Sequence, residues 1–539
     1  MFPENDEKTV FLLNSYYSKD FQAPRKFAKT KSKLFWLITT FVISVLLLIS
    51  NQLGTPEPSD KAPEGLISFD SIVLHDKEQG RNQTKLPVTH AFINSVYFYP
   101  TSKSLGDNAI GMVMAIDQRS HEIDRAVFNL IGTNATMQIN STAISQTEGV
   151  ITCRYTTLMA AGTTVANLTT LELESNGVRV EVPFKMARYT APKPVIICIS
   201  PQFVAEQWQM FVMHVHVANR FGGHLHMYVT SMIESYFELM KEYERQGYMT
   251  LDFWLRMKFS ESQTPYFEPN ENVEWRNQAG AETDCLLQYK EAAEYIAFFD
   301  MDDILFPKSY PTYLEEFNAE WIFSPDSNSM FYGRREHEFI KAETLSEFNF
   351  HELVGSLKSS PLVKRGKVVV KPERYNSTWI HYSIHDAKRR TIEHPSLVHV
   401  QRPLQKHSKT NNNMTSIWKM EFGPLNETIR DEDVRAIEED IQRMRNLSVI
   451  TDIADKLPNA DFYLPIVFKC YYDAFYGPAF DKQKTGYGCP NADSCELPQR
   501  DDFKCVHSDA EYFSGPHMEP VTFHFTKRSR WNWDIGCYQ

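Results

Sequence analysis

Apolar runs that alternate with helix-like segments predict a parallel β-sheet in the middle of this chain. Pro194–Ser200 is a continuous apolar run, as expected of a strand that is buried on both faces. The other predicted strands are His224–Thr230, Tyr248–Phe253 and Ile296–Phe299. The predicted helices between the strands are Phe203–Arg220, Ser231–Gln246 and Ala281–Tyr295. Because strands that alternate with helices form right-handed βαβ units, we expect an α/β core with ligands at the carboxyl ends of its strands.

A different pattern precedes this core. Short β-branched and aromatic runs, separated by turn residues, predict a small and mostly antiparallel β-rich domain over residues 67–190. The runs are Ile67–Leu74, Ala91–Tyr99, Ala109–Ile116, Ala126–Ile131, Val150–Tyr155 and Val178–Phe184. No catalytic pattern stands out in this region, so we expect a spacer and packing module.

The pattern is mixed from residue 350 to about 430. A helix rich in acidic residues and Arg is predicted at Asp431–Arg445, with its charges facing water and a coiled-coil face as the alternative. Residues 465–539 hold five of the eight cysteines and many aromatic residues, so we expect a disulfide-pinned extension that covers the core. The predicted domains are therefore a core over 191–430 and a helical, Cys-rich extension over 431–539.

The N-terminal region predicts a membrane anchor. Leu34–Ser50 carries no charge, and its 17 residues span about 25 Å as a helix, enough for a thin bilayer. Residues 1–33 carry seven basic and four acidic side chains, so the positive-inside rule keeps this tail in the cytosol. Residues 51–66, rich in Pro, Gly and acidic residues, predict a flexible stem. A cleaved signal peptide is the alternative, although its leader would be unusually long.

Cysteines and sequons support a luminal body of type II topology. All eight cysteines follow the anchor, and an even number in an oxidising compartment predicts disulfides of undetermined connectivity. A zinc site is the alternative, but Cys489 and Cys495 are too far apart for a short Cys-x2–4-Cys knuckle. The eight Asn-x-Ser/Thr sequons, which predict glycosylation, also follow the anchor: Asn82, Asn134, Asn140, Asn167, Asn376, Asn413, Asn426 and Asn446.

Composition narrows the classes of function. The 539 residues are 42% hydrophobic and 23% charged, which is typical of a globular protein and excludes a wholly disordered chain, a collagen or a polytopic membrane protein. The net charge of −12 argues against nucleic acid as a partner, because phosphate contacts need clustered Lys and Arg.

One acidic motif suggests chemistry. Asp300, Asp302 and Asp303 directly follow the predicted strand Ile296–Phe299. Because side chains at positions i and i+2 of a strand share a face, Asp300 and Asp302 can converge on one hard divalent cation, Mn²⁺ or Mg²⁺. Such a cation leaves open positions for a diphosphate and neutralises the charge that grows on a departing nucleoside diphosphate. A solvated turn or a helix cap is the alternative for this motif.

Several stretches together resemble glycosyltransferase family 92, whose members are luminal enzymes of the GT-A type. They are Cys198–Phe203 followed by Trp208, the Gly-Gly-x-x-His-Met-Tyr stretch that ends at Tyr228, Asn277–Asp303, Lys371–Arg374 and Trp379–His381. They cover roughly residues 195–405. The resemblance implies a GT-A-like, Rossmann-type nucleotide-sugar transferase core in the Golgi or endoplasmic reticulum, behind the β-rich domain and one transmembrane helix.

The resemblance also implies a reaction and a ligand set. Relatives transfer galactose from UDP-galactose in β-linkage, with inversion and with a metal ion, to glycan or glycoprotein acceptors such as N-glycan cores. By motif match, Asp300 and Asp302 bind the metal–diphosphate and Asp303 orients them. His399 is the candidate for a further metal ligand, although His-Val-Gln-Arg stands where relatives have His-Tyr-Arg, and His381 is the second choice.

Other site residues stay open at this stage. An inverting transfer needs a general base, and the sequence does not choose among Asp326, Glu343, Glu347 and Glu352. Lys371 and Arg374 are candidates to steady the diphosphate, with solvated surface cations as the alternative. We expect structural roles for the alternating histidines His214, His216, His224 and His226.

Two other functions fit the same motif. Haloacid-dehalogenase-type phosphatases also place Asp-x-Asp after an apolar strand, with Asp300 as nucleophile and Asp302 as general acid. A glycan-binding protein that kept the transferase fold without turnover is the other alternative, because fold does not imply function.

Overall fold

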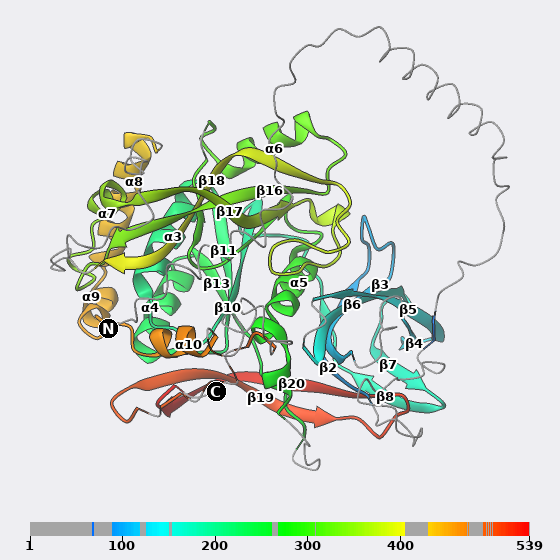
Figure 1. Ribbon diagram of the computed structural model, residues 1–539. Helices are drawn as coiled ribbons and strands as arrows, with labels where there is room; N and C mark the ends of the chain where they lie inside the picture. Colours follow the sequence, from blue (N-terminus) through cyan, green and yellow to red (C-terminus); the bar gives the residue numbers. More distant parts are fainter. Residues whose placement is uncertain are drawn as a thin grey trace, which may run out of the picture. The chain divides into compact units, whose positions relative to one another are not determined.

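Figure 1 shows the computed structural model, which describes residues 67–68, 89–118, 126–149, 153–260, 268–307, 309–404, 429–471, 473 and most of 489–537. The predicted tail, anchor and stem lie outside these residues, as do the sequons at Asn82, Asn413 and Asn426. No helix within the described ranges combines the length and the apolar character needed to cross a bilayer. The described strands form two sheets, one of eight strands and one of twelve.

The eight-stranded sheet contains the predicted α/β core and has the order β13-β11-β10-β14-β17-β16-β18-β15. Its first four strands are parallel and confirm the sequence prediction: β10 (Val195–Gln202), β11 (Gly223–Val229), β13 (Met249–Phe253) and β14 (Tyr295–Phe299). The helices that follow β10, β11 and β13 in the chain are α3 (Trp208–Arg220), α4 (Glu234–Arg245) and α5 (Gln278–Tyr289). This half of the sheet is therefore a βαβ arrangement, with β14 leading to the acidic motif.

The other half of this sheet is formed by long strands that the sequence pattern did not predict. They are β16 (Ser329–Ile340), β17 (Lys358–Val370) and β18 (Arg389–Leu404), with the short β15 (Asp303–Leu305) at the edge. β17 is antiparallel to β14, whereas β16 and β18 are parallel to each other. Between them in the chain lie α6 (Tyr313–Phe323), α7 (Phe350–Ser356) and the short 3-10 helix η5 (Pro372–Arg374). Figure 1 shows these strands crossing above the parallel ones.

The twelve-stranded sheet unites the β-rich region with the C-terminal segment. Its main path is β12-β19-β20-β2-β3-β6-β5-β4-β7-β8, with β1 beside β4 and β9 beside β2. The strands are β1 (Ile67–Ser68), β2 (Thr89–Tyr99), β3 (Ala109–Asp117), β4 (Ala126–Thr133), β5 (Gln138–Glu148), β6 (Tyr155–Thr163), β7 (Thr170–Ser175), β8 (Val178–Val182), β9 (Lys185–Met186), β12 (Ser231–Ile233), β19 (Lys504–Ser514) and β20 (Val521–Ile535). The helix predicted at Ser231–Gln246 is wrong in its first three residues, because β12 pairs with β19.

Three helices precede the C-terminal hairpin: α8 (Asp431–Arg445), α9 (Ser448–Ala454) and α10 (Tyr463–Tyr471). α8 has the predicted bounds, but its charges do not all face water. Its apolar side, including Ile437, joins the same hydrophobic cluster as α3. Asp433 is buried and pairs with Arg220 of α3 at 2.7 Å. The prediction that the charges face water therefore holds except at Asp433, and the apolar side of this amphipathic helix packs on the core.

Four disulfides confirm the oxidised state predicted for the cysteines: Cys153–Cys489, Cys198–Cys285, Cys470–Cys495 and Cys505–Cys537. No free cysteine remains, so the zinc alternative has no ligands. Cys198–Cys285 joins β10 to α5. Cys153–Cys489 joins the β-rich region to the C-terminal segment.

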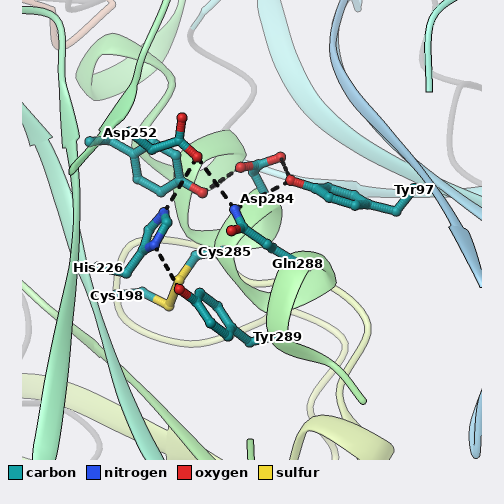
Figure 2. Close-up of a disulfide and its surroundings, with 9 residues drawn as sticks. Tyr97, Cys198, His226, Asp252, Asp284, Cys285, Gln288 and Tyr289 are labelled. Atoms are coloured by element: carbon teal, nitrogen blue, oxygen red, sulfur yellow. Dashed lines mark hydrogen bonds and ion pairs between the residues drawn. A yellow bond between two sulfur atoms is a disulfide. The ribbon is translucent and has the colours of Figure 1, made fainter. Parts of the chain in front are cut away.

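A buried polar network connects the β-rich sheet to the α/β core beside the Cys198–Cys285 disulfide (Figure 2). Asp284 of α5 accepts hydrogen bonds from Tyr97 of β2, at 3.0 Å, and from Tyr228 of β11. His226 of β11 lies 3.2 Å from the Tyr289 hydroxyl. Because these groups are almost fully buried, each hydrogen bond offsets a desolvation cost, and the network fixes α5 against both sheets.

Candidate active site

The acidic motif occupies a tight turn between β14 and β15. β14 ends at Phe299, and the Asp303 amide donates a hydrogen bond to the Asp300 carbonyl at 3.1 Å. The Met301 carbonyl accepts a hydrogen bond from His214 Nδ1 of α3 at 3.1 Å. Because the chain turns here, the strand rule that places positions i and i+2 on one face does not hold for Asp300 and Asp302.

Asp300 is held by two neighbours. Lys367 Nζ of β17 lies 2.9 Å from Asp300 Oδ2, and Gln278 Nε2 of α5 donates to Oδ1 at 2.8 Å. Lys367 is almost fully buried and also donates to the Ile380 carbonyl at 2.6 Å. Burial alone would lower the pKa of Lys367, but Asp300 and Glu282 outweigh it and raise the pKa. Lys367 is therefore a buried, charged partner of Asp300, which the sequence pattern did not single out.

Asp303 is fully buried and pairs with two cationic groups. In the register of β15 and β18 it stands opposite His399, whose Nδ1 lies 2.8 Å from Asp303 Oδ1. Arg334 Nη1 of β16 lies 3.3 Å from Asp303 Oδ2. Burial would raise the pKa of Asp303, but Arg334 and His399 hold it well below its usual range. Asp303 is thus an ionised carboxylate that fixes the imidazole of His399.

The second nitrogen of His399 has no hydrogen-bond partner, although the residue is only 4% exposed. Its Nε2 lies 3.6 Å from Asp302 Oδ2 and 3.8 Å from Glu336 Oε2. Burial would lower the pKa of His399, but Asp302 and Asp303 raise it to about 9. The side chain of Asp302 is 33% exposed, so this carboxylate reaches solvent while its neighbours do not.

These groups fit a divalent metal ion. Asp302, Asp303 and His399 each offer a ligand atom, and these atoms lie within 4.8 Å of one another. Since Nδ1 of His399 is engaged by Asp303, Nε2 is the atom free to bind a metal. A carboxylate on the far nitrogen of a metal-binding histidine is the usual way that proteins fix the tautomer and orientation of the ring. Carboxylate ligands suit hard cations such as Mg²⁺ and Mn²⁺, and an imidazole ligand suits divalent transition metals.

Lys371 and Arg374, predicted to steady a diphosphate, lie at the wrong end of β14. Val370 pairs with Ile296, at the start of β14, whereas Asp300 follows its end. Along the strand, Ile296 and Asp300 are four residues of extended chain apart, a distance of about 13 Å. Arg374 Nη1 donates to the carbonyl of Ser327 at 3.2 Å, and Lys371 Nζ lies over the Trp321 ring at 5.6 Å. The cations beside the aspartates are Lys367 and Arg334.

The four candidate bases lie on the surface. Asp326, Glu343, Glu347 and Glu352 are all exposed, and among the described residues none forms an ion pair or a side-chain hydrogen bond with the aspartates. The acidic residues beside the motif are Glu336 and Glu282, which no sequence signal distinguished from surface acids. Glu282 is fully buried on α5, and burial, with Asp300 nearby, raises its pKa to about 8.

The remaining histidines have structural contacts. His381, the second choice for a metal ligand, lies 2.9 Å through Nδ1 from the Gly366 carbonyl. Burial, Lys367 and Arg334 lower its pKa. The structural roles expected for the alternating histidines are confirmed by their hydrogen bonds. His214 bonds to the Met301 carbonyl, His216 to Asp440, His224 to Thr250 and His226 to Tyr289.

The β-rich region contributes to the site through Glu148, at the end of β5. This fully buried carboxylate accepts hydrogen bonds from Ser377 Oγ at 2.8 Å, from the Ile384 amide at 3.0 Å and from Ser383 Oγ. The segment 377–384 that it holds includes Ile380, whose carbonyl binds Lys367. The expectation of a mere spacer is therefore too simple, because this region fixes a segment that touches the partner of Asp300.

Comparisons with known proteins show the family of this chain. The family model described as glycosyltransferase family 92 matches residues 193–445. Glycosyltransferase family 92 protein ZK381.2 of Caenorhabditis elegans is 66% identical over 471 residues, which cover 87% of this chain and 93% of the relative. Protein F55C10.4 of the same family and organism is 43% identical over 473 residues, 84% of this chain and 91% of the relative.

A solved structure, that of S. aureus TarS 1–349, matches at 9% identity with a TM-score of 0.21, over 38% of this chain and 60% of that one. A similarity this low supports no conclusion about fold or function. The two relatives, in contrast, match along most of their length and along most of this chain. By this similarity the chain belongs to glycosyltransferase family 92.

Proposed function

We propose that this family member is a metal-dependent, inverting hexosyltransferase that moves galactose from UDP-galactose to a glycan acceptor such as an N-glycan. Family membership supports the transfer of a glycosyl group. The choice of galactose and of the acceptor rests on the resemblance between the sequence motifs of this chain and those of family members that transfer galactose. The observation that carries the metal requirement is the unpartnered, buried Nε2 of His399, 3.6 Å from the partly exposed Asp302.

In this proposal Asp302 and His399 hold the metal ion, which is Mn²⁺ or another hard divalent cation. The ion supplies Lewis-acid stabilisation of the charge that develops on the departing nucleoside diphosphate. Asp303 is a positioning residue, since it binds Nδ1 of His399 and leaves Nε2 for the metal. Arg334 keeps the buried Asp303 ionised and thereby maintains that orientation.

Asp300 has a different role in the proposal. Both of its carboxylate oxygens already have partners, Lys367 and Gln278. We therefore assign Asp300 to holding Lys367 at the edge of the site, where a buried ammonium group can stabilise phosphate charge. Using Asp300 as a metal ligand, as the motif alone suggests, would require it to exchange these partners.

We further propose a type II membrane protein of the Golgi or endoplasmic reticulum with a luminal catalytic body. Leu34–Ser50 supports the anchor. The four disulfides support an oxidising compartment. Five sequon asparagines within the described residues are exposed or half-buried, and therefore accessible to glycosylation: Asn134, Asn140, Asn167, Asn376 and Asn446.

A donor screen tests the proposed function. The full-length chain, purified in detergent with Mn²⁺, is offered each UDP- and GDP-sugar and an array of glycan acceptors. We expect transfer from UDP-galactose that EDTA abolishes and Mn²⁺ restores, and we expect Asp302→Ala to lose Mn²⁺-dependent UDP binding. Transfer that is insensitive to EDTA would contradict the metal mechanism. Binding of UDP and glycans without transfer from any donor would instead indicate the inactive glycan-binding protein.

A further inference from the structure

Glu336 has an unexplained position beside the proposed metal ligands. It lies on β16, directly opposite His399 in the register of β16 and β18. Its Oε1 pairs with Lys364 Nζ at 3.2 Å. Its Oε2 is buried without a hydrogen-bond partner and lies 3.8 Å from His399 Nε2, which is also buried without a partner. Leaving a buried polar atom unpaired costs free energy, so two such atoms that face each other call for an explanation.

One cation would satisfy both atoms. Ligand atoms about 2.1 Å from a small divalent ion and at right angles to each other are about 3 Å apart. The observed separations from His399 Nε2 are 3.6 Å to Asp302 Oδ2 and 3.8 Å to Glu336 Oε2. Shortening each of these two separations by less than about 1 Å would reach the spacing of ligands that lie at right angles on such an ion. Hydrogen bonding between the two atoms explains the arrangement less well, because 3.8 Å is too long for one.

We propose that Glu336 is a third protein ligand of the metal ion, so that the ligand set is Asp302, His399 and Glu336. This inference rests on the proposed function only in taking the site to bind a divalent cation. Two carboxylate oxygens suit Mn²⁺, and a six-coordinate ion held by these three residues would keep three positions for water and a diphosphate. Asp303 stays behind His399 as its positioning residue.

A direct binding measurement tests this ligand set. Mn²⁺ alone is titrated calorimetrically into the full-length chain and into Glu336→Gln, Asp302→Asn and Glu338→Gln. Glu338 is the matched control, because it lies on the same strand and forms no ion pair with any described residue. We expect Glu336→Gln to raise the Mn²⁺ dissociation constant at least tenfold, Asp302→Asn to do the same, and Glu338→Gln to leave it within twofold. Melting temperatures verify that each variant is folded.

A change of metal preference separates ligation from a remote effect of charge. Thiolates favour soft cations over Mn²⁺, so a cysteine that replaces a true ligand raises affinity for Cd²⁺ relative to Mn²⁺. We expect Glu336→Cys to increase the Cd²⁺/Mn²⁺ affinity ratio at least tenfold, and Glu338→Cys to leave it unchanged. A loss of charge alone would weaken both metals together and would leave the ratio near the wild-type value.

The outcomes distinguish this inference from the proposed function. If Asp302→Asn loses Mn²⁺ while Glu336→Gln keeps it, or if Glu336→Cys leaves the ratio unchanged, then Glu336 is not a ligand and the proposed function stands. If the wild-type chain binds neither Mn²⁺ nor Cd²⁺, both the ligand set and the metal mechanism are wrong.

Discussion

The role of Asp303 gives the sharpest test of how the site is organised. Asp303→Asn keeps the size of the side chain and removes its charge. Asn can present either an oxygen or an NH₂ group to His399 Nδ1, and it no longer balances Arg334, which lies 3.3 Å away. The substitution therefore loosens the imidazole without touching the proposed metal ligands Asp302 and His399.

The magnitude follows from the contacts that are lost. The hydrogen bond between His399 Nδ1 and Asp303 Oδ1, 2.8 Å long and fully buried, is charge-assisted, and such bonds contribute about 1.5–3 kcal/mol. Loss of a carboxylate behind a metal-binding histidine weakens metal binding about 10- to 100-fold, or about 1.4–2.7 kcal/mol. Breaking the buried pair with Arg334 costs about 3–5 kcal/mol of stability, because the guanidinium is left without its partner.

The assay combines calorimetric titration with Mn²⁺ and thermal unfolding. We expect Asp303→Asn to weaken Mn²⁺ binding by about 10- to 100-fold and to lower the melting temperature in metal-free buffer. Asp302→Asn is the matched comparison, since its carboxylate is 33% exposed and the buried His399 beside it keeps its bond to Asp303. It should lose Mn²⁺ binding with little change in the metal-free melting temperature.

A dissociation constant within twofold of wild type for Asp303→Asn would refute this reasoning. It would show that the orientation of His399 does not depend on the carboxylate behind it. A large loss of metal-free stability in Asp302→Asn would equally contradict the assignment of Asp302 as the solvent-facing member of the cluster.

Three further predictions concern the rest of the fold. Glu148→Gln should lower kcat and change KM less, because the substitution loosens the segment that touches Lys367. An unchanged kcat in steady-state kinetics would refute this. The double variant of Cys198 and Cys285 to Ala should lose about 2–5 kcal/mol of stability and melt earlier than wild type, since the disulfide closes a long loop, and an unchanged melting temperature would exclude this contribution. Burial lowers the pKa of His214 to about 4 and of His226 to about 3, below the unfolded value of about 6.5, so the unfolded state takes up protons first as the pH falls. Protonation of each histidine in the unfolded state should therefore remove about 2 kcal/mol of stability as the pH falls from 6.5 to 5. His226→Gln should make the fall in melting temperature over that range less steep, and an equally steep fall would refute this prediction.

The sequence predicted the parts of the fold that depend on local pattern. β10 and β14 are continuous apolar runs, and such a run is typical of a strand that is buried on both faces. The acidic motif follows β14 as expected. The long strands β16 and β18 were missed because charged residues such as Arg334 and Arg335 interrupt their apolar pattern. Their pairing brings together residues some 60 positions apart, which no local window contains.

The twelve-stranded sheet shows the same limit more clearly. β20 pairs with β2, although more than 400 residues separate Thr89 from Val521. Local pattern identified the first strands of this sheet but could not reveal that the C-terminal segment completes it. Likewise, the even number of cysteines predicted disulfides, whereas the partner of each cysteine depends on the tertiary fold.

The candidate site was predicted as a motif and not as an arrangement. Asp302 and His399 meet as the resemblance implied, but the turn after Phe299 gives Asp300 different neighbours from those expected of a strand. Lys367 and Glu336 escaped notice because a lone charge in a strand gives no sign of whether it faces solvent or a carboxylate. The opposite error placed Lys371 at the site, although it lies level with the start of β14, at the end away from Asp300.

The central claim is that His399 and Asp302 bind one divalent cation, and pulsed electron paramagnetic resonance of bound Mn²⁺ tests it most directly. A histidine nitrogen bound to Mn²⁺ gives a nitrogen coupling in the spectrum. We predict this coupling in the wild-type chain and in His381→Gln, and its loss in His399→Gln. A coupling that persists in His399→Gln, or that is absent from the wild-type chain with Mn²⁺ bound, would contradict the account.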